Sequence, residues 1–259
     1  MIIRLLSAAL VAGFLAAVVA TGLQLGLTSP LIIAAERYEA QAETHAARVA
    51  PWTHAARVAP GLPIVLAHGH GEDGPAHGGS GAAPAWQPGP GLPRMAFTGL
   101  ATLIGGVGYA LLLGAAMLAC RREPTPERAL AFAVAGFAAA ALAPALGLPP
   151  ELPGSEAAPL AARQAWWLMT AAATAMGLYL IAIRRAGIAI VGGLVLIVAP
   201  HLAGAPEVGV SPSALPAGLA AQFAARSLAV SFVFWAVIGL AFGWAWQVFG
   251  RTAPAPARA

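Results

Sequence analysis

The segment Leu5–Ala35 reads LLSAALVAGFLAAVVATGLQLGLTSPLIIAA and contains no charged side chain. A helix of about 20 consecutive, mostly apolar residues is long enough to cross the hydrocarbon core of a bilayer. A helix in lipid also satisfies its own backbone hydrogen bonds, which an isolated strand cannot do. The segment therefore predicts a transmembrane helix.

Further runs of the same kind follow along the chain. Four of them contain no charged residue and no histidine: Met95–Cys120, Ala129–Pro150, Gln164–Ile183 and Ser227–Gly250. A weaker run, Ala186–Pro206, holds only His201 and contains Pro200, where we expect the helix to break. The sequence thus predicts six spans, five of them strong.

The composition of the whole chain agrees with a membrane location. Of 259 residues, 59% are hydrophobic and 9% are charged, whereas a soluble domain carries about 25% charged residues. The formal charge of +4 comes from scattered arginines without any lysine, and a nucleic-acid surface needs clustered cations. We therefore expect an all-α integral membrane protein, a polytopic helical bundle with five to six transmembrane helices. We expect it to lie in the lipid bilayer and not to bind nucleic acid.

The short connections predict how the bundle is oriented. Residues 1–36 would form the first helix, 37–94 an outer loop, 95–250 the remaining four or five helices, and 251–259 a cytoplasmic tail. Every short connection on one side is basic, with Arg4, Arg121, Arg122, Arg128, Arg184, Arg185, Arg251 and Arg258. The positive-inside rule makes this side cytoplasmic, so both termini are expected inside.

The first twenty residues allow a second interpretation. One arginine, an apolar centre and following small residues are also the pattern of a cleaved signal peptide. The apolar stretch is longer than the 7–15 residues of a signal-peptide core, which favours a retained helix. Either outcome leaves the next loop outside.

In this orientation all six histidines and eight of the ten acids face outward. Imidazole and carboxylate are ligands of first-row divalent metals. The outer loop is rich in Gly, Pro and Ala and is expected to be largely disordered. It contains a repeated octapeptide, THAARVAP, at residues 44–51 and 53–60, then HGHGED at residues 68–73 and His77. His68, His70 and His77 are candidate metal ligands, and an inert linker is the alternative.

Other candidates lie where the spans reach the outer face. Glu36 and Glu39 are three residues apart and share a face if the first helix continues. Glu151 follows a proline-rich exit, and His201 follows Pro200. These four residues are candidate metal ligands. Further candidates for the wall of an outer vestibule are Arg163, Gln164, Trp166, Trp167, Gln222 and Arg226. For each of them, an interface anchor such as an aromatic belt, or a helix cap, is the alternative.

The sequence lacks common enzyme patterns. It has no lysine for a P-loop and no HExxH motif, so we expect neither catalysis nor a tightly bound cofactor. The glycines at 105, 106 and 108 lie in a charge-free run and predict close helix packing. The main polar side chains within the spans are Gln24, Thr102, Thr170 and Thr174, so the path across the bilayer stays unassigned.

Five segments together carry a family resemblance: LQLGLTSPLIIAAERYE at 23–39, residues 144–154, RQAWW at 163–167, APHLAGAP at 199–206 and residues 215–228. They resemble the CbtA family of probable cobalt transporter subunits. The resemblance extends over nearly the whole chain apart from the first loop. It implies uptake of Co²⁺ across the bacterial inner membrane. It also implies a CbtB-like partner, a small single-span protein with a His-rich segment, and about five spans. Imidazole and carboxylate also accept Ni²⁺, Zn²⁺ and Cu²⁺, and Ni²⁺ is the second cargo that we expect.

Together these features predict a membrane subunit of a divalent metal transporter. The outer histidines and acids would concentrate the hydrated ion, and the candidates at the ends of the spans would remove part of its water. An inside-negative potential supplies about 4.6 kcal/mol per 100 mV for a divalent cation. The alternative is a non-transporting membrane protein that binds metal for sensing or assembly.

Overall fold

The computed structural model describes residues 1–49, 91–153, 155, 157–207 and 215–251. These residues form helices and no strand. Five helices are long and apolar enough to cross a membrane: Ile2–Tyr38, Leu92–Ala119, Pro126–Ala145, Leu160–Arg184 and Ala217–Arg251. A shorter apolar helix covers Gly187–Ala203. The chain is therefore an all-α, multi-pass membrane protein, as its composition predicts.

Three of the long helices contain a π-helical turn, marked η. The elements in chain order are α1 (Ile2–Leu23), η1 (Gln24–Thr28), α2 (Ser29–Val49), α4 (Leu92–Ala119), α5 (Pro126–Phe137), η2 (Ala138–Leu142), α6 (Ala143–Ala145), α7 (Leu160–Tyr179), η3 (Leu180–Arg184), α8 (Gly187–Ala203) and α9 (Ala217–Arg251). Pro30 and Pro144 each follow a π-helical turn by two residues. A proline removes a backbone donor from the preceding turn, which explains a local change of helix register.

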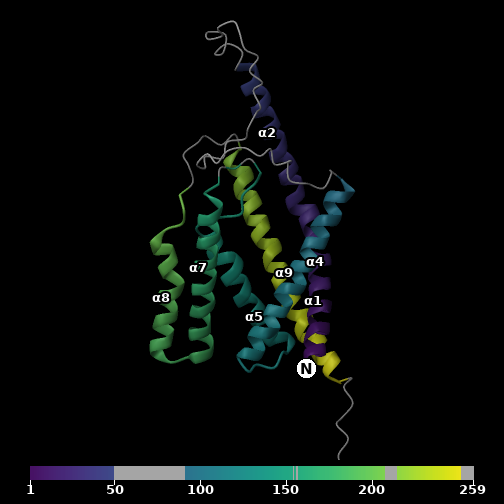
Figure 1. Cartoon of the computed structure of the whole chain (residues 1–259), viewed down its shortest axis with the longest axis vertical. Helices are drawn as coiled ribbons and strands as arrows, with labels where there is room; N and C mark the ends of the chain where they lie inside the picture. The colour runs from purple at the N-terminus through teal and green to yellow at the C-terminus, as the bar shows by residue number, and fades with distance from the viewer. Residues whose placement is uncertain (50–90, 154, 156, 208–214, 252–259) are drawn as a thin grey trace, which may run out of the picture.

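The continuous helices Ile2–Tyr38, α4, Pro126–Ala145, Leu160–Arg184, α8 and α9 alternate in direction, so Met1 and the end of α9 lie at the same end of the bundle (Figure 1). We call this the terminal end and the opposite one the distal end. The arginine-rich connections α4–α5 and α7–α8 both lie at the terminal end. Glu36 belongs to α2, which projects from the bundle at the distal end, while Glu151 follows α6 and Glu207 follows α8 in the connections on that side.

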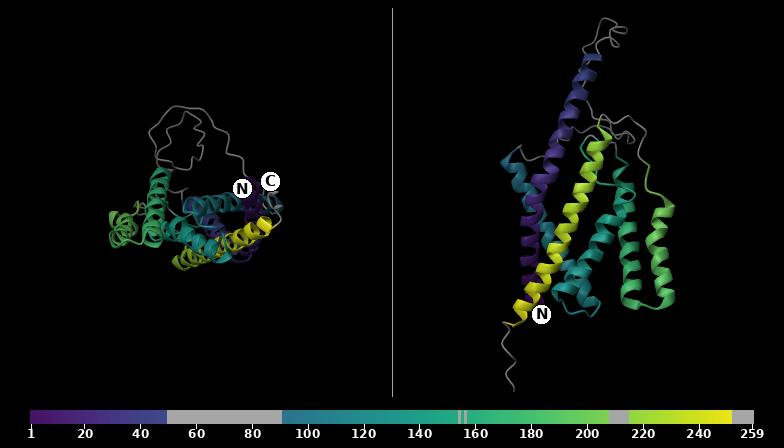
Figure 2. Two further views of the ribbon diagram at one scale, coloured as in Figure 1. Left: turned by 90° about the horizontal axis from the view of Figure 1, so that it is seen from below. Right: turned by 180° about the vertical axis from the view of Figure 1, so that it is seen from behind.

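The helix α8 does not break at Pro200. It continues to Ala203 and ends at Gly204, whose φ is +89°. The expected break is wrong because Pro200 lies in the last turn, where only the carbonyl of Leu196 loses its donor, and because the fixed φ of proline suits a helix. Among the described elements, α8 contacts only α7 and η3, and it lies at the margin of the bundle in both side views (Figures 1 and 2).

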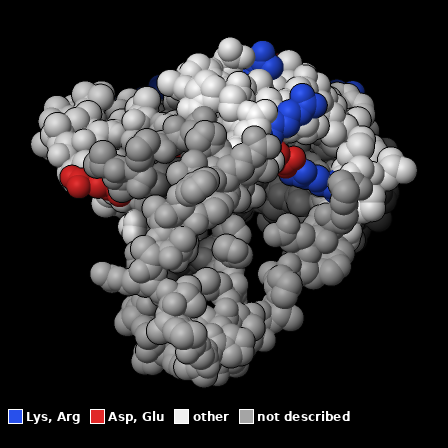
Figure 3. All heavy atoms as spheres, turned by 90° about the horizontal axis from the view of Figure 1, so that it is seen from above, with Lys and Arg blue, Asp and Glu red and all other residues white. Residues whose placement is uncertain are grey.

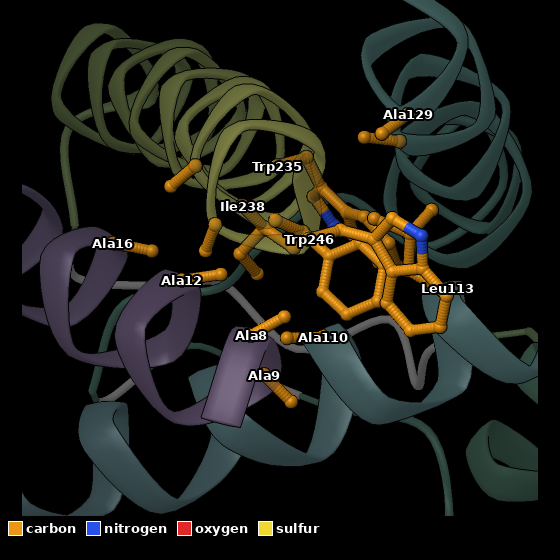
Figure 4. Close-up of a cluster of buried hydrophobic side chains, with 14 of the residues drawn as sticks. Ala8, Ala9, Ala12, Ala16, Ala110, Leu113, Ala129, Trp235, Ile238 and Trp246 are labelled. Carbon is orange, nitrogen blue, oxygen red and sulfur yellow. The ribbon is translucent and has the colours of Figure 1, made fainter. Parts of the chain in front are cut away.

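The main core lies where α1, α4, α5 and α9 meet near the terminal end. Buried alanines of α1 pack against large side chains of α9, and the close-up shows Ala8 and Ala12 beside Ile238 and Trp246 (Figure 4). A small face against a bulky one lets helices approach closely when lipid supplies no hydrophobic drive between them. This cluster fixes α9 relative to α1.

Glycines bring the backbones of α1 and α4 into contact. A Cβ added to Gly13 would lie 2.5 Å from the backbone nitrogen of Val107, and one added to Gly106 would lie 2.8 Å from the carbonyl oxygen of Gly13. The prediction that the glycines of this run serve helix packing is confirmed at Gly106. It is wrong for Gly105 and Gly108, where an added Cβ meets nothing within 4 Å. Gly177 and Gly193 form a similar crossing between α7 and α8.

Candidate functional site

A cleft of about 1040 Å³ lies among α1, η1, α2, α4 and α9. Its lining in this part of the chain runs from Gly91, the residue before α4, to Tyr109, which is about 27 Å along a helix. Gly91 precedes the distal end of α4 (Figure 1). The cleft therefore leads from the distal end deep into the part of the bundle that spans the membrane.

An ion pair joins α2 to α4 beside the entrance of the cleft. Arg94 Nη2 donates to Glu36 Oε1 at 2.8 Å, and the side chains are 50% and 40% exposed. Both residues line the cleft. Figure 3 views the distal end, where the visible charged groups are few and an acidic side chain lies beside a basic one.

The π-helical turn η1 places polar groups on the cleft wall. Gln24 begins this turn and lines the cleft, as do Thr28 and Thr102. Thr102 Oγ1 lies 3.5 Å from Gln24 Oε1, and Thr28 Oγ1 donates to the backbone carbonyl of Gln24 at 3.0 Å. Single π-helical turns within α-helices are frequent at functional sites.

An arginine of α9 supports the same turn from the other side. Arg226 Nη1 donates to the carbonyl oxygen of Leu27 at 3.1 Å. Arg226 and Gln222 lie one turn apart in α9, as their spacing predicts, but neither is among the lining residues. Arg226 thus holds the backbone that presents Gln24 to the cleft.

Aromatic rings close the cleft toward the terminal end. The ring of Tyr109 lies 6.2 Å from that of Phe234 in an edge-to-face arrangement and 4.9 Å from that of Trp235. Tyr109 and Phe234 line the cleft, while Trp235 belongs to the buried core. The lining of the cleft therefore extends from Gly91 at the distal end to these rings, which lie next to the buried core.

A smaller cavity, of about 650 Å³, lies where α6 is followed by α7. Arg163 Nη1 donates to Glu151 Oε2 at 3.1 Å within it. Gln164, Trp166 and Trp167 also contribute to the lining. The Glu151 side chain is 25% exposed, so it remains partly open to solvent or headgroups.

The two tryptophans fasten α7 to the helix that precedes it. Trp166 Nε1 donates to the Pro144 carbonyl at 3.2 Å, and Trp167 Nε1 donates to the Ala140 carbonyl at 2.9 Å. Ala140 lies four residues before Pro144, so its carbonyl lacks the usual helical donor. Trp166 is only 3% exposed, and therefore serves helix packing more than an interfacial belt.

A comparison with known protein families identifies the family to which this helical bundle belongs. The family described as probable cobalt transporter subunit (CbtA) matches residues 2–247. The chain belongs to the CbtA family. The resemblance seen in the sequence is thereby confirmed. Among curated proteins and solved structures, none matches this chain.

Membership of the CbtA family assigns the protein to a class. It is a membrane subunit of a probable cobalt transporter, and the word subunit implies a partner. The family name describes a transporter and not an enzyme. The expected cargo, cobalt, follows from the same match.

The structure separates the candidate ligands of this CbtA member. Glu36 and Glu151 each pair with an arginine, and the His201 ring lies 5.8 Å from the Trp166 ring. Within the described residues, no three His, Cys, Asp or Glu side chains lie close enough to hold a metal ion. His68, His70 and His77 lie outside the described residues, as does the side chain of Glu39. Their assignment as ligands stays a prediction.

Several polar residues of the cleft escaped the sequence analysis. They include Thr28, Ser29, Thr98, Ser227 and Ser231. A signal for most of them exists, because the apolar spans contain four polar pairs at a spacing of four: 24 and 28, 98 and 102, 227 and 231, and 170 and 174. The first three pairs line the cleft, whereas the pair at 170 and 174 is buried in α7. Residues four apart share one helix face, and all three faces meet in the cleft.

Proposed function

We propose that the cleft is the entry path by which Co²⁺ passes into the membrane during uptake. The observation that carries this proposal is the convergence of three polar helix faces on one cleft, with the Glu36 carboxylate near its entrance. Uncharged apolar walls would not hold a cation, and polar groups within a span are costly unless they face one another or a watery cavity. Membership of the CbtA family indicates that the transported ion is cobalt.

The charge distribution supports an orientation for this path. The terminal end carries Arg4, Arg121, Arg122, Arg128, Arg184, Arg185 and Arg251. By the positive-inside rule we place this end in the cytoplasm of a bacterial cell, with both termini inside and the chain in the inner membrane. The cleft then opens to the outside, as uptake requires.

Outward-facing acids and histidines would capture the ion. Glu36 lies on the cleft, and Glu39 follows it one turn later in α2. His68, His70 and His77 lie outside the described residues. In the sequence they fall between Glu36 and Gly91, and both of these flanking residues line the cleft.

Glu151 and His201 would form a second capture point, beside the smaller cavity. Glu151 lines that cavity, and the His201 ring contacts Trp166, another lining residue. A divalent ion would have to displace Arg163 from Glu151 before binding there. We assign the two residues to capture and not to the path itself, because neither of them lines the larger cleft.

The energy for inward movement would come from the membrane potential. A divalent cation gains about 4.6 kcal/mol per 100 mV when the inside is negative. We infer a CbtB-like partner with a single span and a His-rich segment, Ni²⁺ as a second cargo, and no tightly bound cofactor. The aromatic closure at Tyr109 has to open for passage, and a partner helix would assist this step.

The test is uptake of radioactive cobalt into cells that lack their own cobalt importers. The chain is expressed alone and with its small partner, and membrane insertion is verified in each case. We expect uptake in at least one setting. A chain that lacks residues 44–81 should keep transport with a raised KM, whereas complete loss would indicate a binding protein whose loop is the whole site. Inserted protein without any uptake would refute the proposal.

A further inference from the structure

We propose that the cleft binds the divalent cation as its intact aqua ion, through hydrogen bonds from the metal-bound waters to protein oxygen atoms. This inference rests on the proposed function and names the chemical form of the cargo. It differs from the partial dehydration at outer ligands that the sequence suggests. The residues concerned are Gln24, Thr28, Glu36, Thr98, Thr102, Ser227 and Ser231.

Each threonine hydroxyl of the cleft already donates its hydrogen to a backbone carbonyl of its own helix. Thr28 Oγ1 donates to the carbonyl of Gln24, Thr98 Oγ1 donates to that of Arg94 at 2.9 Å, and Thr102 Oγ1 donates to that of Thr98 at 2.8 Å. A hydroxyl oxygen carries two lone pairs besides its one hydrogen. Each of these three oxygens therefore faces the cleft as an acceptor.

The carboxamide of Gln24 adds an acceptor at the same level. Its Oε1 lies 3.5 Å from Thr102 Oγ1, at the outer limit of a hydrogen bond. Because the Thr102 hydrogen is directed to its own helix, Gln24 Oε1 keeps acceptor capacity for a ligand. Acceptors suit the waters of an aqua cation, since a metal-bound water presents its hydrogens outward.

The lining offers too few ligands to replace the water. Of the described residues that line the cleft, Glu36 is the one carboxylate, and none is histidine or cysteine. Imidazole, thiolate and carboxylate are the groups that bind first-row divalent metals directly. Removing an ion from water without such compensation is very costly. Retaining the first hydration shell avoids that cost.

The cleft has room for a hydrated ion. Six waters at about 30 Å³ each occupy roughly 180 Å³, while the cleft volume is about 1040 Å³. The space admits the aqua ion and a further layer of water on the way to Tyr109. Glu36 near the entrance is the one carboxylate of the described lining and attracts a cation that displaces Arg94 from it, and the neutral oxygens deeper in the cleft replace the second shell.

Hexaamminecobalt(III) is the probe for this inference. Its six ammonia ligands do not exchange on the time scale of the experiment, and their N–H groups point outward like the hydrogens of an aqua ion. A site that must remove the first shell cannot bind it. A site that recognises the shell itself can.

Binding is measured by calorimetry on the full chain in nanodiscs of zwitterionic lipid. We expect hexaamminecobalt(III) to bind, and the double variant Gln24→Leu with Thr102→Val to weaken binding at least tenfold. Thr170→Val is the matched control, because Thr170 is fully buried in α7, is not among the lining residues, and its hydroxyl has no hydrogen-bond partner. It should leave binding unchanged. Absence of binding, or equal binding to the double variant, would overturn the inference.

Uptake of radioactive Co²⁺ by cells separates this inference from the proposed function. External hexaamminecobalt(III) should inhibit that uptake competitively. If Co²⁺ enters but the inert ion neither binds nor inhibits, the aqua-ion inference fails and the proposed function stands. If the inert ion binds the cleft but Co²⁺ does not enter, the proposed function fails and the aqua-ion site stands.

Discussion

The Glu36 carboxylate of α2 and the Arg94 guanidinium of α4 are joined by a hydrogen bond of 2.8 Å at the cleft. The two residues are 58 positions apart in the sequence, and the His-rich segment lies between them. Arg94 therefore occupies the carboxylate that an entering cation would use. Any ion drawn to Glu36 has to compete with this arginine.

Removing Arg94 should make capture easier. Arg94→Gln is expected to lower the KM for Co²⁺ uptake by about two- to fivefold, because an exposed ion pair is worth less than about 1 kcal/mol. Glu36→Gln should raise the KM by about fivefold, because it removes the one carboxylate of the described lining, and an exposed charge contact of this kind is worth about 1 kcal/mol. Arg37→Gln is the control, since it removes an equal charge from the neighbouring position of α2. If Arg94→Gln and Arg37→Gln change the KM equally, a general charge effect and not the pair is responsible.

The hydrogen bond from Arg226 should matter through the π-helical turn. Arg226→Leu removes the donor to the Leu27 carbonyl, and the turn is expected to relax and rotate Gln24 away from the cleft. We predict at least a tenfold loss of Co²⁺ uptake at normal membrane abundance. Arg226→Lys retains a donor and should restore most of the uptake. Equal activity of both variants would show that Arg226 does not position this turn.

The contact between α1 and α4 should not tolerate a larger residue. Gly13→Val places a side chain against the backbone of Val107, and overpacking of this kind costs about 1–3 kcal/mol. We expect a lower midpoint of thermal unfolding in detergent. Gly22→Val, in the same helix but with open space around it, is the matched control and should be close to neutral. A similar loss in both variants would contradict the close packing.

The indole of Trp167 should compensate for Pro144. Trp167→Phe leaves the Ala140 carbonyl without its donor, at an expected cost of about 1–2 kcal/mol. Pro144→Ala restores a backbone N–H to the preceding turn. The double variant should therefore lose less stability than the sum of the single changes, as measured by thermal unfolding. Additive losses would indicate that the two groups act independently.

Much of the fold is predictable because lipid imposes simple rules. A charge-free run such as Leu5–Ala35 has to be helical in a bilayer, and five such runs correspond to the five long helices. The end of α8 is harder to predict from the sequence. Whether a proline ends a helix depends on where the last turn lies, and Pro200 falls inside it. The π-helical turns also follow from local register, which apolar composition does not encode.

The candidate site was predictable only in part. Gln24 and Thr102 stood out as rare polar residues within spans, and Glu36 as the acid that follows the first span. That they share one cleft depends on how α1, α4 and α9 cross, which is set by small contacts such as Gly13 against Gly106. A search for ligand types alone favours histidines and acids, and so passes over hydroxyl groups that accept hydrogen bonds.

The central claim is that Co²⁺ crosses through the cleft from outside. The most direct measurement uses Thr102→Cys in a chain whose single cysteine, Cys120, is changed to Ser. Uptake of radioactive Co²⁺ is measured before and after treatment of intact cells with a membrane-impermeant thiol reagent. Leu112→Cys, on an exposed part of the same helix, is the control. The account predicts that the reagent modifies Thr102→Cys from outside and abolishes its uptake, that Co²⁺ slows this reaction, and that the control is unaffected. Full modification with unchanged uptake, or no reaction from outside, would contradict it.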